Sequence, residues 1–196
     1  STVIINLYGG HEKINSYLDF ASGYGNLTRF LVYKIENHKI WVSDIKKDAV
    51  DFQKDQFCVN GFYSCVDPAN FIVEEKFDFI SVNSLFSHLP LSTFYLWFEK
   101  LYNLLSSNGT LMLSVHDSEL TKDSKGKDFF YIKGNEDISF KEVDNILRNT
   151  ANYGGTFVSE KFMNDIFTKL NIEKKSVKRY RKAMWAYQDV YIVSKA

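Results

Sequence analysis

The feature that most constrains the fold is a strand, a turn and a helix in direct succession over residues 17–31. An apolar run, Tyr17–Phe20, leads into a turn of small residues with glycines at 23 and 25, and a helical pattern follows. Glycine has no Cβ, so the backbone N–H groups of such a turn can approach a ligand closely. The start of the helix behind the turn favours anions. This pattern is typical of a nucleotide-like cofactor held at the carboxyl edge of a parallel sheet.

Strands and helices alternate beyond this turn. We predict strands over 39–43, 62–66, 77–83 and 110–115, and helices over 27–35, 47–59 and from residue 91 to a stop at 108–109. In the first helix, an apolar face of Leu27, Phe30, Leu31 and Ile35 should cover the sheet. A helix capped by Ser159 and two antiparallel strands, about 172–180 and 185–193, close the chain.

This order predicts an α/β fold. We expect a Rossmann-like, seven-stranded, mostly parallel sheet with an antiparallel last strand and helices on both faces. We predict a single domain over residues 1–196. Residues 117–156 show no strand or helix period apart from a short helical pattern near 141–148, and so long a stretch is typical of a lid or insertion on the substrate side.

Composition narrows the possible partners. Lys and Arg number 24, as do Asp and Glu, so no excess charge points to nucleic acid. No apolar run approaches the roughly 18 residues of a membrane span. Two cysteines are too few for a disulfide framework and lack metal-site spacing, so we expect reduced thiols, a cytoplasmic protein and no metal.

Two acidic residues follow predicted strands. Asp44 comes 19 residues after Gly25, where a carboxylate can accept hydrogen bonds from ribose hydroxyls; it can also cap the next helix. Asp67 precedes Pro68, and it can accept from an exocyclic amine of a base or open a turn. Both alternatives stay open for each residue.

Two histidines also follow predicted strands, His88 and His116. An imidazole titrates near neutrality, which suits a general base, although a hydrogen-bonded structural histidine is the alternative for each. Near the C-terminus, residues 174–182 carry six Lys and Arg side chains. Such a run is typical of a solvated hairpin, and the sharper alternative is a contact for phosphate or an anionic sugar.

Taken together, these stretches resemble the class I S-adenosylmethionine-dependent methyltransferases. Residues 19–25, Asp-Phe-Ala-Ser-Gly-Tyr-Gly, match the first motif of that family. Asp44 matches its acid after the second strand, residues 77–80 match its fourth-strand motif, and 104–113 match the turn before its fifth strand, where Pro-Gly-Gly is the commoner spelling. The closing helix and hairpin match the reversed seventh strand of the family.

The resemblance implies S-adenosylmethionine as cofactor and S-adenosylhomocysteine as product. It implies a cofactor site made by Asp19, Ala21, Ser22, Gly23, Gly25, Asp44, Ile45, Asp67, Asn83 and Phe86. A narrower likeness at 86–90, 153–159 and 188–190 is to bacterial methyltransferases often associated with glycan or secondary-metabolite pathways. It implies acceptor contacts from Tyr153, Gln188 and Asp189, although Asp189 has basic neighbours with which it can pair instead.

The expected function is methyl transfer (EC 2.1.1.-) to a small-molecule or saccharide acceptor, at oxygen, by a monomer or homodimer. Residues 83–86, Asn-Ser-Leu-Phe, lack the motif of enzymes that methylate nucleic-acid amines. A non-catalytic cofactor-binding paralogue or partner subunit is one alternative. A nicotinamide-dependent oxidoreductase is disfavoured because Thr28 stands where the dinucleotide fingerprint has its third glycine.

Overall fold

The computed structural model describes residues 10, 13–133 and 154–195. They form two compact units, which we describe in turn. The first holds the described parts of Ser1–Asn83, Leu101–Met112 and Ser194–Ala196, and the second holds Ser84–Lys100 and the described part of Leu113–Val193.

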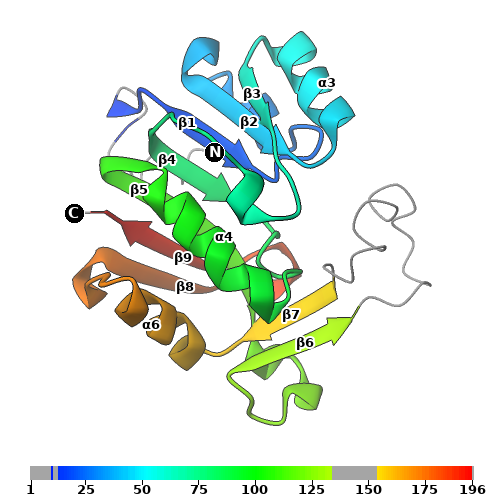
Figure 1. The fold of residues 1–196 in the computed structure, drawn as a ribbon, viewed down its shortest axis with the longest axis vertical. Coiled ribbons are helices and arrows are strands. Elements are labelled where there is room, and N and C mark those ends of the chain that lie inside the picture. Colours follow the sequence, from blue (N-terminus) through cyan, green and yellow to red (C-terminus); the bar gives the residue numbers. More distant parts are fainter. Residues whose placement is uncertain (1–9, 11–12, 134–153, 196) are drawn as a thin grey trace. The chain divides into compact units, whose positions relative to one another are not determined.

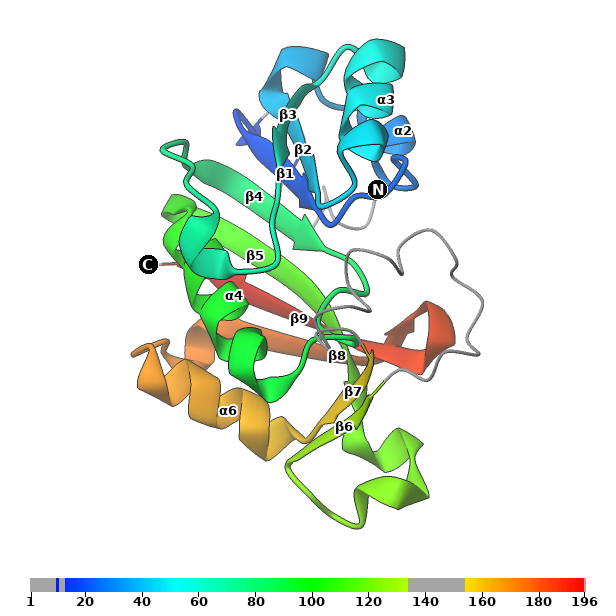
Figure 2. The same cartoon turned by 45° about the vertical axis from the view of Figure 1, so that its right-hand side comes forward.

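The first unit is built on parallel strands. Strand β1 (Tyr17–Phe20) pairs in parallel with β2 (Ile40–Asp44) and β4 (Phe77–Val82), and β2 pairs in parallel with β3 (Asn60–Tyr63). The start of β5 (Leu105–Asp117) lies beside β4, which gives the order β3-β2-β1-β4-β5 (Figures 1 and 2). All four residues of β1 are buried, as expected for a strand covered on both faces.

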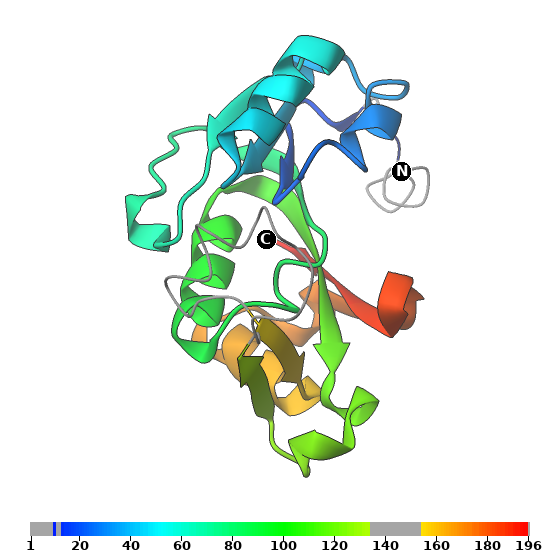
Figure 3. The ribbon, with the colours of Figure 1, turned by 90° about the vertical axis from the view of Figure 1, so that its right-hand side faces the viewer.

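Two helices belong to this unit, α2 (Thr28–Leu31) and α3 (Lys47–Phe57). Helix α3 lies beside β2 and β3 (Figures 1 and 3). It ends where Cys58 adopts a left-handed conformation with φ of 52°. Its buried residues, Ala49, Val50 and Gln53, share one face because Gln53 comes one turn after the adjacent pair Ala49 and Val50.

The predicted apolar face of the first helix is wrong at Phe30, whose side chain is 51% exposed. The helix has only four residues; Leu31 and, beyond its end, Ile35 are buried as predicted, and Thr28 is buried although it was not predicted to be. Thr28 takes an inward position because its hydroxyl has a buried hydrogen-bond acceptor, described below. The inner face of this helix therefore carries the polar Thr28 where the prediction had the apolar Phe30.

Two further boundaries differ from the prediction. Strand β3 starts at Asn60 and ends at Tyr63, so Asp67 lies four residues beyond the strand rather than at its end. Helix α4 (Leu91–Asn103) ends before Leu105, where β5 begins, so residues 108–109 lie within the strand and do not stop the helix. Asn108 has a positive φ of 64°, a conformation that is also common at the ends of helices. The Asn-Gly pair that favours this conformation therefore resembled a helix stop in the sequence.

The second unit contains most of α4, the end of β5 and the last five elements. Strand β7 (Gly154–Val158) pairs in parallel with β5 and antiparallel with β6 (Phe129–Lys133), as Figures 2 and 3 show. Strand β9 (Gln188–Ser194) pairs with β5 and, antiparallel, with β8 (Val177–Met184). Helix α6 (Glu160–Lys169) starts at Ser159, whose Oγ accepts from the Phe162 amide as predicted.

Short 3-10 helices connect the elements. Their bounds are Asn37–Lys39 (η2), Pro68–Asn70 (η3), Ser118–Leu120 (η4), Lys122–Ser124 (η5), Lys174–Ser176 (η6) and Trp185–Tyr187 (η7). Among the described residues, no helix has the length and apolar character needed to cross a membrane.

The α/β architecture with parallel strands and an antiparallel end is confirmed. The described residues contain nine strands rather than seven, because β6 and β7 arise inside the stretch predicted as a lid or insertion. The run Phe-Phe-Tyr-Ile at 129–132 was the signal for β6, since aromatic and β-branched residues favour strands. The predicted helix near 141–148 lies outside the described residues, and the single domain stays a prediction.

Candidate active site

The turn after β1 has an unusual backbone. Ala21, Gly23 and Gly25 have φ of 56°, 52° and 83°, a region that L-residues rarely adopt. Around Gly23, nothing lies within 4 Å of the place where a Cβ would be. At Gly25 a Cβ would lie 2.7 Å from Phe57 and 2.9 Å from Gln53. Only Gly23 therefore keeps open space for a ligand, whereas Gly25 is needed for packing against α3.

Asp19 lies beneath this turn as a buried carboxylate. Its Oδ2 accepts from the Thr28 hydroxyl at 2.9 Å and its Oδ1 from the Ser81 hydroxyl at 3.2 Å. Burial raises the pKa of Asp19 from its ordinary value to about 6, and these two hydrogen bonds partly oppose that rise. Thr28 and Ser81 were not predicted as site residues. Asp19 therefore ties the start of α2, just after the turn, to β4.

Asp44, at the end of β2, holds the other side of the turn. Its Oδ2 accepts from the Gly23 amide at 2.8 Å, and its Oδ1 accepts from the Lys46 amide at 3.0 Å. The carboxylate thus binds both the glycine turn and the start of α3. Each carboxylate oxygen can accept a second hydrogen bond, so ribose hydroxyls are compatible with these contacts.

Three further predicted cofactor residues lie in the same unit. Ile45 is half-buried next to Asp44. Asn83 follows β4 directly, and its buried Oδ1 has no hydrogen-bond partner among the described residues. Asp67 caps the 3-10 helix η3, and its Oδ1 accepts a hydrogen bond from the Ala69 amide at 3.0 Å. Of the two alternatives given for Asp67, the structure thus shows the one in which it opens a turn.

The second unit contains the two predicted histidines. A hydrogen-bonded ladder joins β7 to the loop after β4: the Gly154 amide donates to the His88 carbonyl at 3.1 Å, and the Thr156 amide to the Ser87 carbonyl at 2.8 Å. The Thr156 hydroxyl adds a bond to the Leu89 carbonyl at 2.5 Å. The loop that carries His88 is therefore held against β7.

The His88 ring is anchored by one of its nitrogens. Its Nδ1 lies 2.8 Å from the Gly154 carbonyl oxygen, which can only accept, so we assign the hydrogen to Nδ1 and the basic lone pair to Nε2. Burial lowers the pKa of His88 below its ordinary 6.5, although the bond to Gly154 opposes this. The ring is thus neutral at pH 7, as a general base requires.

His116, near the end of β5, lies close enough to be affected by His88. Burial lowers its pKa, and the charge of His88 lowers it further. The ring stacks on Phe157 of β7 with centroids 5.3 Å apart. Its buried Nδ1 has no hydrogen-bond partner in the part of the chain that the structure describes. The two histidines therefore lie in the same unit, near enough to interact electrostatically.

The remaining predicted residues of this unit have different surroundings. Gln188 is buried, and its side-chain amide is hydrogen-bonded to the Ser84 hydroxyl. The hydroxyl lies 3.3 Å from Gln188 Oε1, to which it can donate, and 3.1 Å from Gln188 Nε2, from which it can accept. Phe86 is fully buried and packs edge-on against Phe94, with centroids 4.8 Å apart, so its ring belongs to the core. Tyr153 lies outside the described residues.

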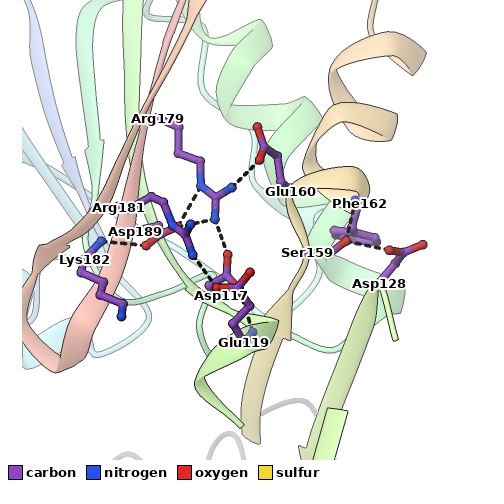
Figure 4. Close-up of polar contacts among 10 residues, drawn as sticks. All are labelled: Asp117, Glu119, Asp128, Ser159, Glu160, Phe162, Arg179, Arg181, Lys182 and Asp189. Atoms are coloured by element: carbon purple, nitrogen blue, oxygen red, sulfur yellow. Dashed lines mark hydrogen bonds and ion pairs between the residues drawn. The ribbon is translucent and has the colours of Figure 1, made fainter. Parts of the chain in front are cut away.

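Asp189 is part of an ion-pair network around Arg179 (Figure 4). Arg179 Nε and Nη2 donate to Asp189 at 2.8 and 2.6 Å, Nη1 donates to Glu160 at 2.8 Å, and Nη2 also contacts Asp117. The Lys182 amide donates to the second oxygen of Asp189 at 2.8 Å. This geometry favours pairing of Asp189 with its basic neighbours, the alternative to an acceptor contact.

Three of the six basic side chains of the run form such ion pairs. Besides Arg179, Arg181 pairs with Glu119 at 2.5 Å and Lys175 with Glu173 at 2.6 Å. A pocket of about 310 Å³ between α6, η6 and β8–β9 is lined by Glu160, Lys174, Arg179 and Tyr191 among others. Lys174 and Arg179 belong to the basic run, and none of the predicted cofactor or acceptor residues lines this pocket. In the described residues no group of three or more His, Cys, Asp or Glu is arranged to hold a metal ion.

Comparisons with known proteins identify the domain. Residues 18–111 match the family model described as a methyltransferase domain. No curated protein sequence matches the chain. The matched stretch, just under half of the chain, contains the glycine turn, Asp44 and the fourth strand. It confirms the resemblance to class I S-adenosylmethionine-dependent methyltransferases for this part of the chain.

Solved structures share the fold at low sequence identity. An O-methyltransferase family protein from Burkholderia thailandensis is 12% identical with a TM-score of 0.64; the match covers 100% of this chain but only 56% of that protein. The 1,6-didemethyltoxoflavin-N1-methyltransferase of the same organism, solved with S-adenosylhomocysteine, is 14% identical with a TM-score of 0.67, over 100% and 76%. DesVI from Streptomyces venezuelae is 11% identical with a TM-score of 0.69, over 100% and 90%.

Proposed function

We propose that this protein is an S-adenosylmethionine-dependent methyltransferase (EC 2.1.1.-) that acts on an oxygen of a small-molecule or saccharide acceptor. The observation that carries the cofactor assignment is the turn at Gly23. Space is open on the outer side of Gly23, and the Gly23 amide is bonded to the Asp44 carboxylate at the end of β2. This carboxylate can accept further hydrogen bonds. The neighbour solved with S-adenosylhomocysteine has the same fold, which supports the choice of cofactor.

The residues of the first unit fit such a ligand in distinct ways. Asp44 would accept from the ribose hydroxyls, and Ile45 beside it would contact the adenosine. The buried Oδ1 of Asn83, which has no hydrogen-bond partner among the described residues, would accept a hydrogen bond from the methionine part of the cofactor. Asp19 and Ser22 would shape the turn, and Ala21, Gly23 and Gly25 give it the required backbone. Asp67 remains the proposed acceptor for adenine, and Phe86 would contribute backbone atoms rather than its buried ring.

Bound S-adenosylmethionine would supply an activated methyl group, and the protein has to align the acceptor and remove its proton. We assign proton removal to His88, because its neutral ring has Nε2 as the basic nitrogen. His116 is the second candidate for this role. His88 Nε2 would take the proton of the acceptor hydroxyl, so that the hydroxyl oxygen could receive the methyl group and S-adenosylhomocysteine would be left as the product. A general base of this type typically contributes about 10²–10⁴-fold to the rate.

Tyr153 and Gln188 are the proposed acceptor contacts, with Asp189 a weaker proposal because Arg179 engages it. The neighbours include an O-methyltransferase family protein and an N1-methyltransferase, so oxygen is proposed from the histidine pair alone. We further propose a cytoplasmic monomer or homodimer without a nucleic-acid partner. A non-catalytic cofactor-binding protein is the second candidate.

The first test is calorimetric titration of the protein with S-adenosylhomocysteine and, separately, with NAD. Binding of the first ligand and not the second is expected; NAD binding alone would overturn the cofactor assignment. Transfer of labelled methyl from S-adenosylmethionine across sugars, phenols and small acids then tests activity. His88→Ala should abolish most turnover with little change in S-adenosylhomocysteine affinity. An equal loss of both would refute the base assignment.

A further inference from the structure

Gln53 of α3 is a polar side chain that the sequence gives no reason to single out. It lies in a polar helix, yet its side chain is fully buried, on the same face as Ala49 and Val50. Burying an amide costs free energy unless the amide is hydrogen-bonded. Its contacts therefore decide what the residue does.

The Gln53 amide points at the glycine turn. Its Nε2 lies 2.8 Å from Ser22 Oγ, 2.7 Å from the Gly23 carbonyl and 3.4 Å from the Ala49 carbonyl. A carbonyl oxygen only accepts, so the amide nitrogen rather than the oxygen must face Gly23, and the orientation of the amide follows from its surroundings. Gln53 thus bonds to the two consecutive residues at the centre of the turn.

The other end of the amide, the buried Oε1, has no hydrogen-bond partner among the described residues and faces Gly25. A Cβ at Gly25 would lie 2.9 Å from Gln53 Oε1 and 3.1 Å from Gln53 Cδ. The lack of a side chain at Gly25 is therefore what allows the turn to close on α3. The two glycines have separate tasks, because Gly25 meets Gln53 whereas Gly23 is open on its outer side.

A turn of this shape needs such support. Left-handed backbone at a residue with a Cβ costs roughly 1–2 kcal/mol, and Ala21 adopts it at φ of 56°. Several hydrogen bonds oppose this cost: the Ser22 amide donates to the Ser43 carbonyl at 3.1 Å, the Gly25 amide to the Ser22 carbonyl at 3.0 Å, and the Gly23 amide to Asp44. The Gln53 amide adds a bond to the Gly23 carbonyl and one to the Ser22 hydroxyl, which itself donates to the Ser43 carbonyl at 3.4 Å.

We propose that Gln53 is a positioning residue for the cofactor turn: from α3, it holds Ser22 and Gly23 in the conformation that binds S-adenosylmethionine. This inference rests on the proposed function for its ligand, and it goes further by assigning part of the cofactor affinity to a side chain that does not touch the cofactor. Loss of the amide donors should let the turn relax while β1, β2 and β4 keep their pairing.

The test compares Gln53→Met with Gln56→Met, the same change at an exposed position one turn along α3. Val50→Ala is the second control, because it shortens a buried side chain of the same helix face that lies beside Gly61 of β3. We expect Gln53→Met to weaken S-adenosylhomocysteine binding roughly tenfold, as the loss of one to two net hydrogen bonds implies. Gln56→Met and Val50→Ala should bind within about twofold of the wild type. Gln53→Glu against Gln56→Glu repeats the comparison if the methionine variant does not fold.

Amide hydrogen exchange supplies a readout that needs no ligand. Gln53→Met should speed exchange at Gly23 and Gly25 and leave the amides of β1 and β4 protected, a change that general destabilisation would not confine to the turn. Equal binding and equal exchange in Gln53→Met and Gln56→Met would overturn the positioning role. A wild type that binds no S-adenosylhomocysteine would instead overturn the proposed function, while local exchange at the two glycines would still report on the support that Gln53 gives.

Discussion

The Nδ1 atom of His88 and the carbonyl oxygen of Gly154 lie 2.8 Å apart, so the first residue of β7 determines which ring nitrogen carries the hydrogen. Gly154 also meets the backbone of the neighbouring strand closely. A Cβ there would lie 2.2 Å from the Ile132 carbonyl oxygen, whereas a Cβ at Gly155 would meet its nearest atom at 3.6 Å. One position of β7 thus tolerates only glycine, and its carbonyl binds the proposed base.

The first prediction uses this difference. Gly154→Ala must shift β7 away from β6, which breaks the bond to His88 and lets its Nε2–H tautomer form. We expect turnover to fall by at least roughly tenfold, because the base is then partly in the wrong tautomer. Nitrogen NMR of the imidazoles detects the tautomer directly, and the chain has only four histidines to assign. Gly155→Ala is the matched control, and an unchanged His88 tautomer in Gly154→Ala would contradict the proposal.

The second prediction concerns the pair of histidines. The charge of His88 and burial together lower the pKa of His116. His88→Ala removes the charge, so the pKa of His116 should rise part of the way toward 6.5. A proton NMR titration between pH 4 and 8 measures this. The control is His38→Ala, which removes a histidine with a mostly exposed side chain in the other unit and should leave His116 unchanged.

The third prediction concerns the buried carboxylate of Asp19. Burial raises its pKa from 3.8 to about 6, so between these pH values the folded state binds the proton more tightly than the unfolded state does. Stability contributed by this group is therefore complete below pH 4 and is lost as the pH rises through 6. Asp19→Asn cannot ionise. Its free energy of unfolding, relative to the wild type, should increase by roughly 2 kcal/mol from pH 4 to pH 7.

Urea unfolding at several pH values measures this difference. Asp55→Asn, on the exposed side of α3, is the matched control and should show no such trend relative to the wild type. A constant difference between Asp19→Asn and the wild type would mean that Asp19 titrates normally in the folded protein.

Much of the first unit could be predicted from the sequence, because its signals are local. The strand at Tyr17–Phe20, the acid at the end of β2 and the apolar fourth strand each follow from a few neighbouring residues. Gln53 could not be found this way, because its partners are 30 and 31 residues away and a polar residue in a polar helix is ordinarily exposed. Thr28 was noted for excluding a dinucleotide site, but its bond to Asp19 needs the fold to be known.

In the second unit, long-range pairing decided what the sequence left open. Strand β7 begins with two glycines, which disfavour strands, yet it is held by β6, by the end of β5 and by the His88 loop. The basic residues of 174–182 suggested either a solvated face or an anion site. The carboxylates that pair with Arg179 come from β5, α6 and β9, so no local pattern shows that the charge is already neutralised.

The last prediction tests that network by comparing two arginines of one strand. Arg179 is 14% exposed, and its partner Asp189 is 1% exposed, so Arg179→Met leaves buried carboxylates without their counter-charge. Breaking a buried pair from one side typically costs about 3–5 kcal/mol. Arg181 is 54% exposed and pairs with an exposed Glu119, so Arg181→Met should cost no more than about 1 kcal/mol. Denaturant unfolding at pH 7 measures both. Equal losses in the two variants would show that Arg179 does not stabilise the buried carboxylates.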